Sequence, residues 1–307
     1  MMLETSNPTL SPAAPDAPSA SAALPARHGL SVDVEDYFQV WGFSSVVDRA
    51  TWDDYDPRVG ESTREVLDLF DGAGVKGTFF TLGWVAERDP QLIREIVARG
   101  HELASHGYDH TKVFDQTASA FREDITRTKA ILEDVSGAPI GGYRAAGFSI
   151  DQRTPFAYEE LAAAGYRYSS STHPIAHDHY GDPNAPQVPF HPLAGDPFLE
   201  APVATATVLG RRVSCAGGGW FRAMPYAASK KLFAQAADQH GGQLIFYFHP
   251  WEIDQDQPRV ADAPLKSRLR HYLNLSTMKG KLHRLLTDFS WDRIDQIIQP
   301  QSSTVAA

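Results

Sequence analysis

Short apolar stretches alternate with amphipathic ones along most of this chain. Residues 28–34, 77–82 and 101–105 are short, apolar or β-branched, and are predicted to be strands. Residues 62–70 and 90–100 carry apolar side chains at helical spacing. Strands that alternate with helices predict an α/β protein with a mainly parallel sheet, either open or closed into a barrel.

Local signals place the ends of the first helices. Ser62 is expected to be an N-cap, with Glu65 at the capping-box position, and Gly72 and Gly74 are expected to end that helix. Pro90 stands where the first turn of the next helix tolerates proline.

The same alternation continues toward the C-terminus. A long amphipathic helix is predicted over 117–135, ended by Gly137, and a shorter helix over 156–164. Strands are predicted at 141–145, 166–171 and 243–248.

Residues capable of chemistry follow several of the predicted strands. They are Asp33, Glu35 and Asp36 after the first strand, His106 and His110 after the third, and Arg144 and His249 after two later ones. Because functional side chains of such barrels lie at the carboxyl ends of the strands, we expect these residues to share one active site.

His106 and His110 are spaced i and i+4, so on a helical turn or a similar tight turn both imidazoles project to one side. This spacing suits two nitrogen ligands of one divalent metal, although H-x-x-x-H alone is also common in surface histidines. A carboxylate from Asp33, Glu35 or Asp36 would complete the set and leave positions for water. Asp33 and Glu35 share a strand face, and the residues alone do not decide which acid binds metal.

Other residues near these strand ends are candidates for catalysis or substrate contact. His249 follows an apolar strand and is either a core histidine or an acid that protonates a departing amine. Trp251 would form an apolar wall or a face for sugar stacking. Arg144 would hold Asp33 ionised and oriented. The remaining candidates for substrate contact are Phe148, Trp84 and Tyr108.

Composition removes several classes of function. The chain has 307 residues, 38 acidic against 28 basic and a net charge of −10, which argues against a nucleic-acid partner. The one cysteine, Cys215, cannot form an intrachain disulfide and is expected to be buried. The glycine run 217–219 does not fit a dinucleotide-binding pattern, and no apolar stretch is long enough to predict a transmembrane helix.

The two ends of the chain differ from the rest. Residues 1–26 are mostly Ala, Pro and Ser and are expected to be a disordered tail, as are residues 299–307. Glu4 and the prolines that follow it do not fit a signal peptide, so we expect a cytoplasmic protein with one domain over 27–298.

Several motifs in order resemble those of the polysaccharide deacetylases of carbohydrate esterase family four (NodB homology). The segments are SVDVEDYFQV, GTFFTLGWVAER, HELASHGYDH, GYRAAGFSI, GGGWFRAMPY, FYFHPWEID and HYLNLSTMKGKLHRLL, spread over about residues 28–298. The chain is more narrowly similar to the branch encoded beside exosortase and exopolysaccharide loci, which carries a C-terminal extension.

This resemblance implies a distorted (β/α) barrel and metal-dependent removal of N-acetyl groups from an amino-sugar polymer, with zinc as the expected metal. It implies His106 and His110 as metal ligands, Asp33 as general base, Arg144 as its brace and His249 as general acid. The metal carboxylate is Glu35 in one register, which we favour, and Asp36 in the other. A polymer substrate fits a cytoplasmic enzyme if a lipid-linked precursor is met at the inner membrane face.

Two positions depart from the family pattern. Ala146 stands where the arginine motif has proline, and Ser169 replaces an aspartate expected to keep the acid histidine protonated, for which Asp178 or Asp254 could substitute. These departures leave a non-catalytic glycan-binding relative as an alternative. A non-haem iron oxygenase with the same two-histidine, one-carboxylate ligands is another, as is hydrolysis of a small amide or cyclic ureide on the same fold.

Overall fold

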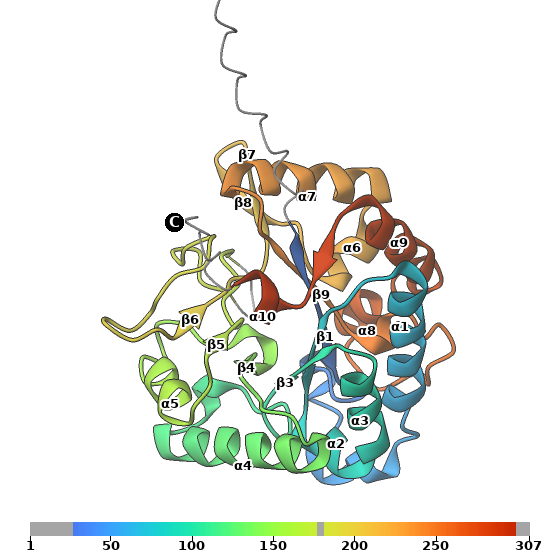
Figure 1. Cartoon of the computed structure of the whole chain (residues 1–307). Helices are drawn as coiled ribbons and strands as arrows, with labels where there is room; N and C mark the ends of the chain where they lie inside the picture. Colours follow the sequence, from blue (N-terminus) through green and yellow to red (C-terminus); the bar gives the residue numbers. More distant parts are fainter. Residues whose placement is uncertain (1–26, 177–180, 299–307) are drawn as a thin grey trace, which may run out of the picture.

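The computed structural model describes residues 27–176 and 181–298. The predicted tails, 1–26 and 299–307, lie outside the described residues. Within the described residues, eight strands form one curved parallel sheet in the order β10-β1-β2-β3-β4-β5-β6, with β9 also paired to β1 (Figure 1). The strands are β1 His28–Val34, β2 Thr78–Thr81, β3 Glu102–Ser105, β4 Gly142–Tyr143, β5 Tyr168–Ser169, β6 Leu199–Glu200, β9 Ile245–Phe248 and β10 Trp291–Asp292.

The ring of strands is incomplete between β6 and β9. Along the described chain no ladder joins these two strands, but the Ala204 N–H, just after β6, donates a hydrogen bond to the Ile245 carbonyl of β9 at 3.0 Å. The sheet is therefore a distorted half-barrel with helices outside it, which confirms the predicted (β/α) fold.

Helices surround the sheet in Figure 1. They are α1 Val59–Ala73, α2 Gly83–Arg88, α3 Pro90–Ala98, α4 Ala118–Ser136, α5 Ala157–Ala163, α6 Gly218–Ala223, α7 Tyr226–His240, α8 Leu265–Tyr272, α9 Leu275–Asp288 and α10 Ile294–Ile297. Short 3₁₀ turns are η1 Trp41–Phe43, η2 Arg49–Asp54, η3 Val113–Asp115, η4 Ala146–Phe148 and η5 Pro250–Glu252, and a separate hairpin joins β7 Thr205–Val208 to β8 Arg211–Ser214.

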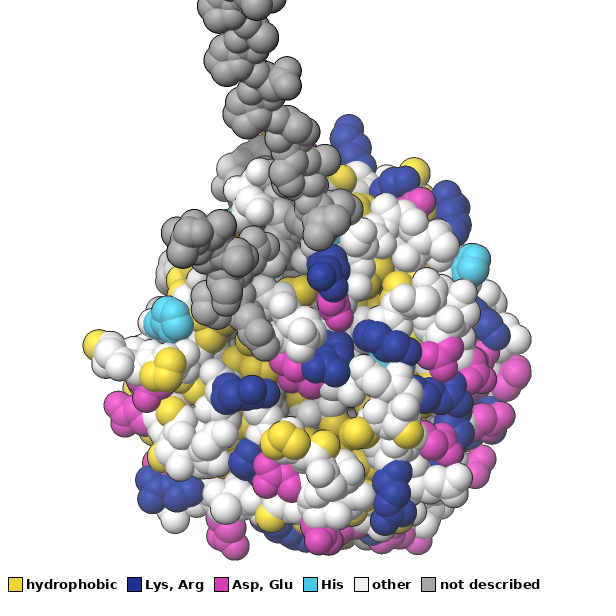
Figure 2. Space-filling view, viewed as in Figure 1, with side chains coloured by type: hydrophobic (Ala, Val, Ile, Leu, Met, Phe, Trp, Pro, Cys, Tyr) yellow, Lys and Arg dark blue, Asp and Glu magenta, His cyan; other side chains and the backbone are white. Residues whose placement is uncertain are grey.

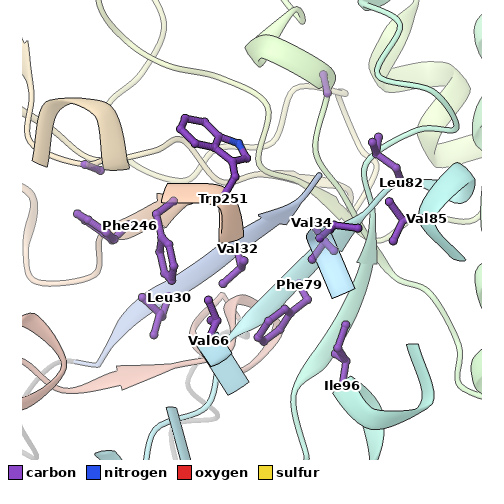
Figure 3. Close-up of a cluster of buried hydrophobic side chains, with 14 of the residues drawn as sticks. Leu30, Val32, Val34, Val66, Phe79, Leu82, Val85, Ile96, Phe246 and Trp251 are labelled. Carbon is purple, nitrogen blue, oxygen red and sulfur yellow. The ribbon is translucent and has the colours of Figure 1, made fainter. Parts of the chain in front are cut away.

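Strand β1 is buried along its whole length and separates two cores. Because successive side chains of a strand point to opposite faces, Leu30, Val32 and Val34 pack outward with Val66 of α1 (Figure 3). Ser31 and Asp33 point to the other face, into the barrel, where a second apolar cluster includes Phe80, Ala104, Phe148, Tyr168 and Tyr247. Asp33, a candidate site residue of β1, is thus on the interior face.

Helix α10 covers the amino-terminal end of the barrel (Figure 1). Its Ile294 and Ile297 join the interior cluster with Ile245 of β9, and the Ile294 N–H donates to Thr78 Oγ1 at 2.8 Å. With that end covered, a cavity that reaches the interior residues opens at the carboxyl ends of the strands.

The first helix begins earlier than the capping-box pattern predicts. Ser62 is buried inside α1, and the Asp36 carboxylate, distant in sequence, accepts hydrogen bonds from the Arg58 and Val59 N–H groups at 2.7 and 2.9 Å. This tertiary contact caps the helix in place of Ser62. At the other end Gly72 lies within the helix, and Gly74 ends it in the left-handed conformation.

Other boundaries agree with the apolar pattern to within a few residues, although the pattern does not predict α2, β6, the β7–β8 hairpin, α6, α7 or the elements after β9. Figure 2 shows Lys and Arg side chains interspersed with Asp and Glu over the face that carries α10, with hydrophobic atoms in small separate spots. Among the described residues, every helix is too short or too polar to cross a lipid bilayer.

His28 makes the stability of the fold sensitive to acid. Its ring packs against Phe233 and Trp291 with centroids 5.0 and 5.6 Å apart, and burial lowers its pKa to about 4. Because the unfolded chain binds a proton near pH 6.5 and the folded chain does not, stability is lost as pH falls from about 6.5 to 4. His28→Phe should remove roughly 2 kcal/mol of that pH-dependent loss, measured by urea unfolding at pH 7.5 and pH 4.5. An equal loss in wild type and variant would contradict this assignment.

Candidate active site

A cavity of about 400 Å³ opens beyond the carboxyl ends of β1, β3 and β9. Its wall contains, of the residues predicted from the sequence, Asp33, Glu35, His106, His110, Phe148, His249 and Trp251. Arg144 lies directly behind Asp33 and is completely buried. The structure therefore gathers most of the predicted site residues around one space.

Glu35, His106 and His110 form a compact group in this wall. One ligand atom from each lies within 4.8 Å of the other two, and all three residues are buried. The two imidazole rings have centroids 5.3 Å apart. Two imidazole nitrogens and one carboxylate oxygen on one side of a cavity make a site for a divalent cation that leaves room for water or substrate.

The turn that carries both histidines is not helical. It follows β3 directly, and both Gly107 and His110 have positive φ, at 75° and 60°. The turn is fixed from outside, since its carbonyls at Gly107 and Tyr108 accept hydrogen bonds from the Gly83 and Trp84 N–H groups that begin α2. Helix α2 thus holds the two imidazoles in place through the backbone.

Glu35 fits a cation better than it fits its protein neighbours. His110 Nε2 lies 2.8 Å from Glu35 Oε2, yet this buried oxygen receives no hydrogen bond from the described residues. Its other oxygen accepts from Trp251 Nε1 at a long 3.4 Å. Although burial opposes it, the imidazoles of His110 and His249 hold the pKa of Glu35 well below its usual range. An ionised carboxylate oxygen with no donor is what a metal ligand requires.

His106 is oriented by the backbone of the arginine motif. Its Nδ1 lies 2.8 Å from the Arg144 carbonyl oxygen, so the ring donates there and leaves its Nε2 lone pair toward the cavity. Burial lowers the pKa of His106 to about 4, which keeps the ring neutral at physiological pH. A neutral imidazole with a fixed tautomer is the form that binds metals.

The second acid register does not match this geometry. The Asp36 side chain turns away from the histidines: Oδ1 accepts from the Tyr37 N–H at 2.8 Å, and Oδ2 holds the start of α1. Asp36 belongs neither to the group of possible ligands nor to the cavity wall. The prediction that Asp36 is a metal ligand is therefore wrong, and its role is to cap the start of α1.

Asp33 is held from behind by Arg144. Arg144 Nη1 donates to Asp33 Oδ1 at 2.6 Å and to Ser31 Oγ at 2.9 Å, while Nε and Nη2 donate to the Ser170 carbonyl and hydroxyl at 2.9 and 2.8 Å. The guanidinium also lies 4.1 Å from the Phe80 ring centroid. With Oδ1 fixed in this way, Oδ2 is the oxygen nearer to His249, at 4.0 Å.

His249 has a carboxylate partner that sequence reasoning missed. Its Nδ1 lies 2.8 Å from Glu252 Oε1, which also accepts from the His249 backbone N–H at 3.1 Å. Glu252 is in turn held by Arg222 Nε at 2.6 Å. Although burial opposes it, the carboxylates of Glu35, Glu252 and Asp33 raise the pKa of His249 to about 9. The i to i+3 spacing across Pro250 was the available signal in the sequence.

The glycine run finds its explanation here. A Cβ on Gly218 would lie 2.0 Å from Glu252 Oε1, so only glycine leaves space for this carboxylate. Gly217, with φ of 99°, would bring a Cβ to 2.8 Å from the Tyr247 hydroxyl oxygen. The run lets α6 approach η5 closely, which a phosphate-binding loop would not require.

Glu252 gives His249 the carboxylate partner that was expected from an aspartate at position 169. Ser169 Oγ lies 2.6 Å from Ser171 Oγ, and the Ser171 hydroxyl accepts from the Ala145 N–H. Of the two acids expected to substitute, Asp254 pairs with Arg58 at 2.9 Å, which corrects that expectation, and Asp178 lies outside the described residues.

The Ala146 turn is held without proline. Ser149 Oγ donates to the Ala146 carbonyl at 2.7 Å and accepts from the Val113 N–H at 2.9 Å. The Phe148 N–H donates to the Ala145 carbonyl, so this group is engaged within the turn.

The aromatic candidates divide into two groups. Phe148 and Trp251 reach the cavity, but Trp251 has His249 stacked on one side at 5.1 Å and His271 on the other at 4.1 Å, so it is a wall and not a sugar platform. Trp84 packs beneath Arg88 and against Trp52, and the Tyr108 hydroxyl donates to Glu87. Neither Trp84 nor Tyr108 lines the cavity, so both assignments to substrate contact are corrected.

Two family models match adjacent parts of the chain. Residues 49–169 match the family model "Polysaccharide deacetylase", and residues 170–299 match the model "Domain of unknown function (DUF3473)". The chain is 34% identical over 77 residues to a peptidoglycan-N-acetylglucosamine deacetylase from Bacillus cereus, covering 25% of this chain and 28% of that one. It is 42% identical over 65 residues to a chitooligosaccharide deacetylase from Sinorhizobium fredii, covering 21% and 28%. The matches thus span under a third of either relative.

A solved structure has the same fold. A protein assigned as a polysaccharide deacetylase from Mycobacterium smegmatis superposes with a TM-score of 0.58 at 21% identity, covering 94% of this chain and 93% of that one. The chain therefore has the fold of this solved structure, and its residues 49–169 carry a polysaccharide deacetylase domain of the NodB or carbohydrate esterase family four type.

Metal binding will distinguish the two acid registers. Glu35→Gln should weaken Zn²⁺ binding at least about 100-fold, as should His106→Ala or His110→Ala, because each removes a ligand. Asp36→Asn should keep the affinity within about threefold but lower the free energy of unfolding by about 1–3 kcal/mol, since its amide would face the N–H groups that begin α1. Calorimetric titration measures the Zn²⁺ affinity, and urea unfolding measures the free energy of unfolding. Loss of zinc from Asp36→Asn with retention in Glu35→Gln would instead favour the other register.

Proposed function

We propose that this protein is a metal-dependent N-deacetylase that removes acetyl groups from an amino-sugar polymer or oligosaccharide and releases acetate. The observation that carries the proposal is the placement of three units around one cavity. They are the Glu35–His106–His110 group, the Asp33–Arg144 pair and the His249–Glu252 pair. The family match and the acetamido-sugar deacetylases among its relatives support the same reaction.

Glu35, His106 and His110 would hold a divalent cation, and their nitrogen and oxygen donors suit zinc. Such a cation, when bound, polarises the acetamide carbonyl and lowers the pKa of a coordinated water.

Asp33 is placed to act as the general base. Its Oδ1 is held by Arg144, so Oδ2 accepts the proton from the attacking water with the carboxylate already oriented.

His249 is placed to protonate the leaving nitrogen. Its Nδ1 faces Glu252, so the other ring nitrogen, Nε2, points to the same side as Asp33 and Glu35, at 4.0 and 3.5 Å. Cleavage of the C–N bond transfers the electron pair to the amine, which takes its proton from Nε2. The products are the free amine of the sugar and acetate.

An extended substrate has room at this site. A second cavity of about 400 Å³ shares Val40, Trp41 and His110 with the first, so the hollow continues past the ligand group. Trp41 and Trp220 are 40% and 44% exposed in the wall of the first cavity, where indole faces suit pyranose rings. This shape supports a polymer or oligosaccharide over a small cyclic ureide.

The oxygenase alternative finds no support in the fold, because such sites usually sit in antiparallel sandwiches and this sheet is parallel. The non-catalytic alternative rested on Ser169 and Ala146. Against it, Glu252 gives His249 a carboxylate partner by direct contact, and Ser149 holds the Ala146 turn. Acetate release therefore decides between an enzyme and a glycan-binding relative.

The first test is acetate release from N-acetylglucosamine oligomers by zinc-loaded protein. We expect turnover that a chelator abolishes and added Zn²⁺ restores, and that Asp33→Asn lowers kcat at least about 100-fold with zinc still bound. Glycan binding without acetate from the wild-type protein would favour the non-catalytic relative. Oxygen consumption in the presence of 2-oxoglutarate would favour the oxygenase.

The second test concerns the pair His249–Glu252. His249→Gln should retain zinc and lower kcat about 10²–10⁴-fold, because it removes the proton donor. Glu252→Gln should lower kcat about 10–100-fold with KM within about threefold, because it loosens the ring without touching substrate. His283→Gln, an exposed histidine of α9, is the matched control. Steady-state kinetics on N-acetylglucosamine oligomers measures all three, and an unchanged rate in His249→Gln removes it from the mechanism.

A further inference from the structure

Lys112 is a buried cation in the wall of the active-site cavity. It is 6% exposed, and its ammonium makes no ion pair or hydrogen bond with the described residues. Its Nζ lies 3.8 Å from the Trp41 ring centroid and 5.1 Å from that of Phe114. Buried lysines are normally paired with an anion, and aromatic rings replace only part of the lost hydration. A cation in this position is suited to receive an anion from a ligand.

The backbone makes space for this side chain beside the reaction site. Lys112 follows His110 by two residues, and its Cε would lie 3.5 Å from a Cβ on Gly147, which has a φ of 58°. Gly147 and Phe148 of η4 line the same cavity. The Lys112 side chain therefore passes over Gly147, and its ammonium lies against the Trp41 ring in the cavity wall.

The other charges of the wall are already engaged. Asp33 pairs with Arg144, Glu252 pairs with both His249 and Arg222, and Glu35 lies in the ligand group. No carboxylate of the described chain forms an ion pair with Lys112, and the electrostatic effects of Asp115 and Arg153 on it oppose each other. Lys112 is therefore a positive charge without an ion-pair partner among the described residues, in a chain whose net charge is −10. A uniform acidic surface would repel an acidic glycan, whereas this point attracts one of its charged groups.

We propose that Lys112 binds an anionic substituent on a sugar next to the acetamido sugar, so that the substrate is an acidic glycan. The anion is a uronate carboxylate or a sulfate ester, both of which suit a lysine ammonium. This inference rests on the proposed function only in that the neighbouring sugar is the one that is deacetylated. The role of Lys112 itself is tested by measuring ligand binding.

The experiment uses two pairs of ligands that differ only in charge. One pair is a hyaluronan hexasaccharide, which alternates N-acetylglucosamine and glucuronate, and its carboxyl-reduced form. The other is N-acetylchitotetraose with and without a 6-O-sulfate. Calorimetry on the full-length zinc-loaded chain should show about tenfold tighter binding of the charged member in at least one pair, and that pair identifies the anion.

Lys112→Met keeps the length of the side chain and removes its charge. We expect it to reduce the ratio of the two Kd values from about ten to near one. Lys231→Met, an exposed lysine of α7 outside the cavity wall, changes the net charge equally and should keep the wild-type ratio. Thermal unfolding of both variants checks that they are folded.

Equal affinities within both pairs in the wild-type protein overturn the proposal without any variant. A preference that survives in Lys112→Met, or disappears equally in Lys231→Met, also overturns it. Acetate is measured in the same samples. Its absence with every ligand contradicts the proposed function, while the ratio of affinities still decides the role of Lys112.

Discussion

The guanidinium of Arg144 is the constraint on which the site depends. A charged group with no exposure, inside a barrel, is stable only if its donors are satisfied. Its partners come from two other strands, Asp33 and Ser31 from β1 and Ser170 just after β5. The same residue fixes His106 through its carbonyl oxygen. Arg144 therefore contacts both the proposed base and a ligand of the proposed metal, and it joins strands that are distant in the order of the sheet.

The two matched regions of the chain build one site together. The part that matches the deacetylase model lies before residue 170 and contains the two histidines and Arg144, and Asp33 and Glu35 precede it. The later part contributes His249 together with Glu252 and Arg222, which hold it. Arg222 also donates to the carbonyls of His271 and Leu273 at 2.8 and 2.6 Å. The region of unknown function therefore completes the wall of the cavity and orients a residue at its centre.

The sequence predicted those features that depend on local pattern. Strand β1, the parallel fold and the gathering of Asp33, His106 and His249 follow from apolar periodicity and from what stands after each strand. The directions in which individual side chains point could not be predicted from this pattern. Asp36 is drawn to the start of α1, which also displaces the expected cap at Ser62, and Trp84 packs against Trp52. Glu252 was missed because its importance depends on Arg222, thirty residues earlier in the chain but adjacent in space.

Gly218 has a consequence beyond this single molecule. Since a methyl group there would overlap the carboxylate of Glu252, the two positions cannot vary independently among related sequences. A chain that enlarges residue 218 must shorten or redirect residue 252 and find another partner for its histidine. Covariation between these two positions would therefore separate related chains in which a glutamate of the following turn holds the proposed acid histidine from those in which an aspartate at position 169 is expected to do so.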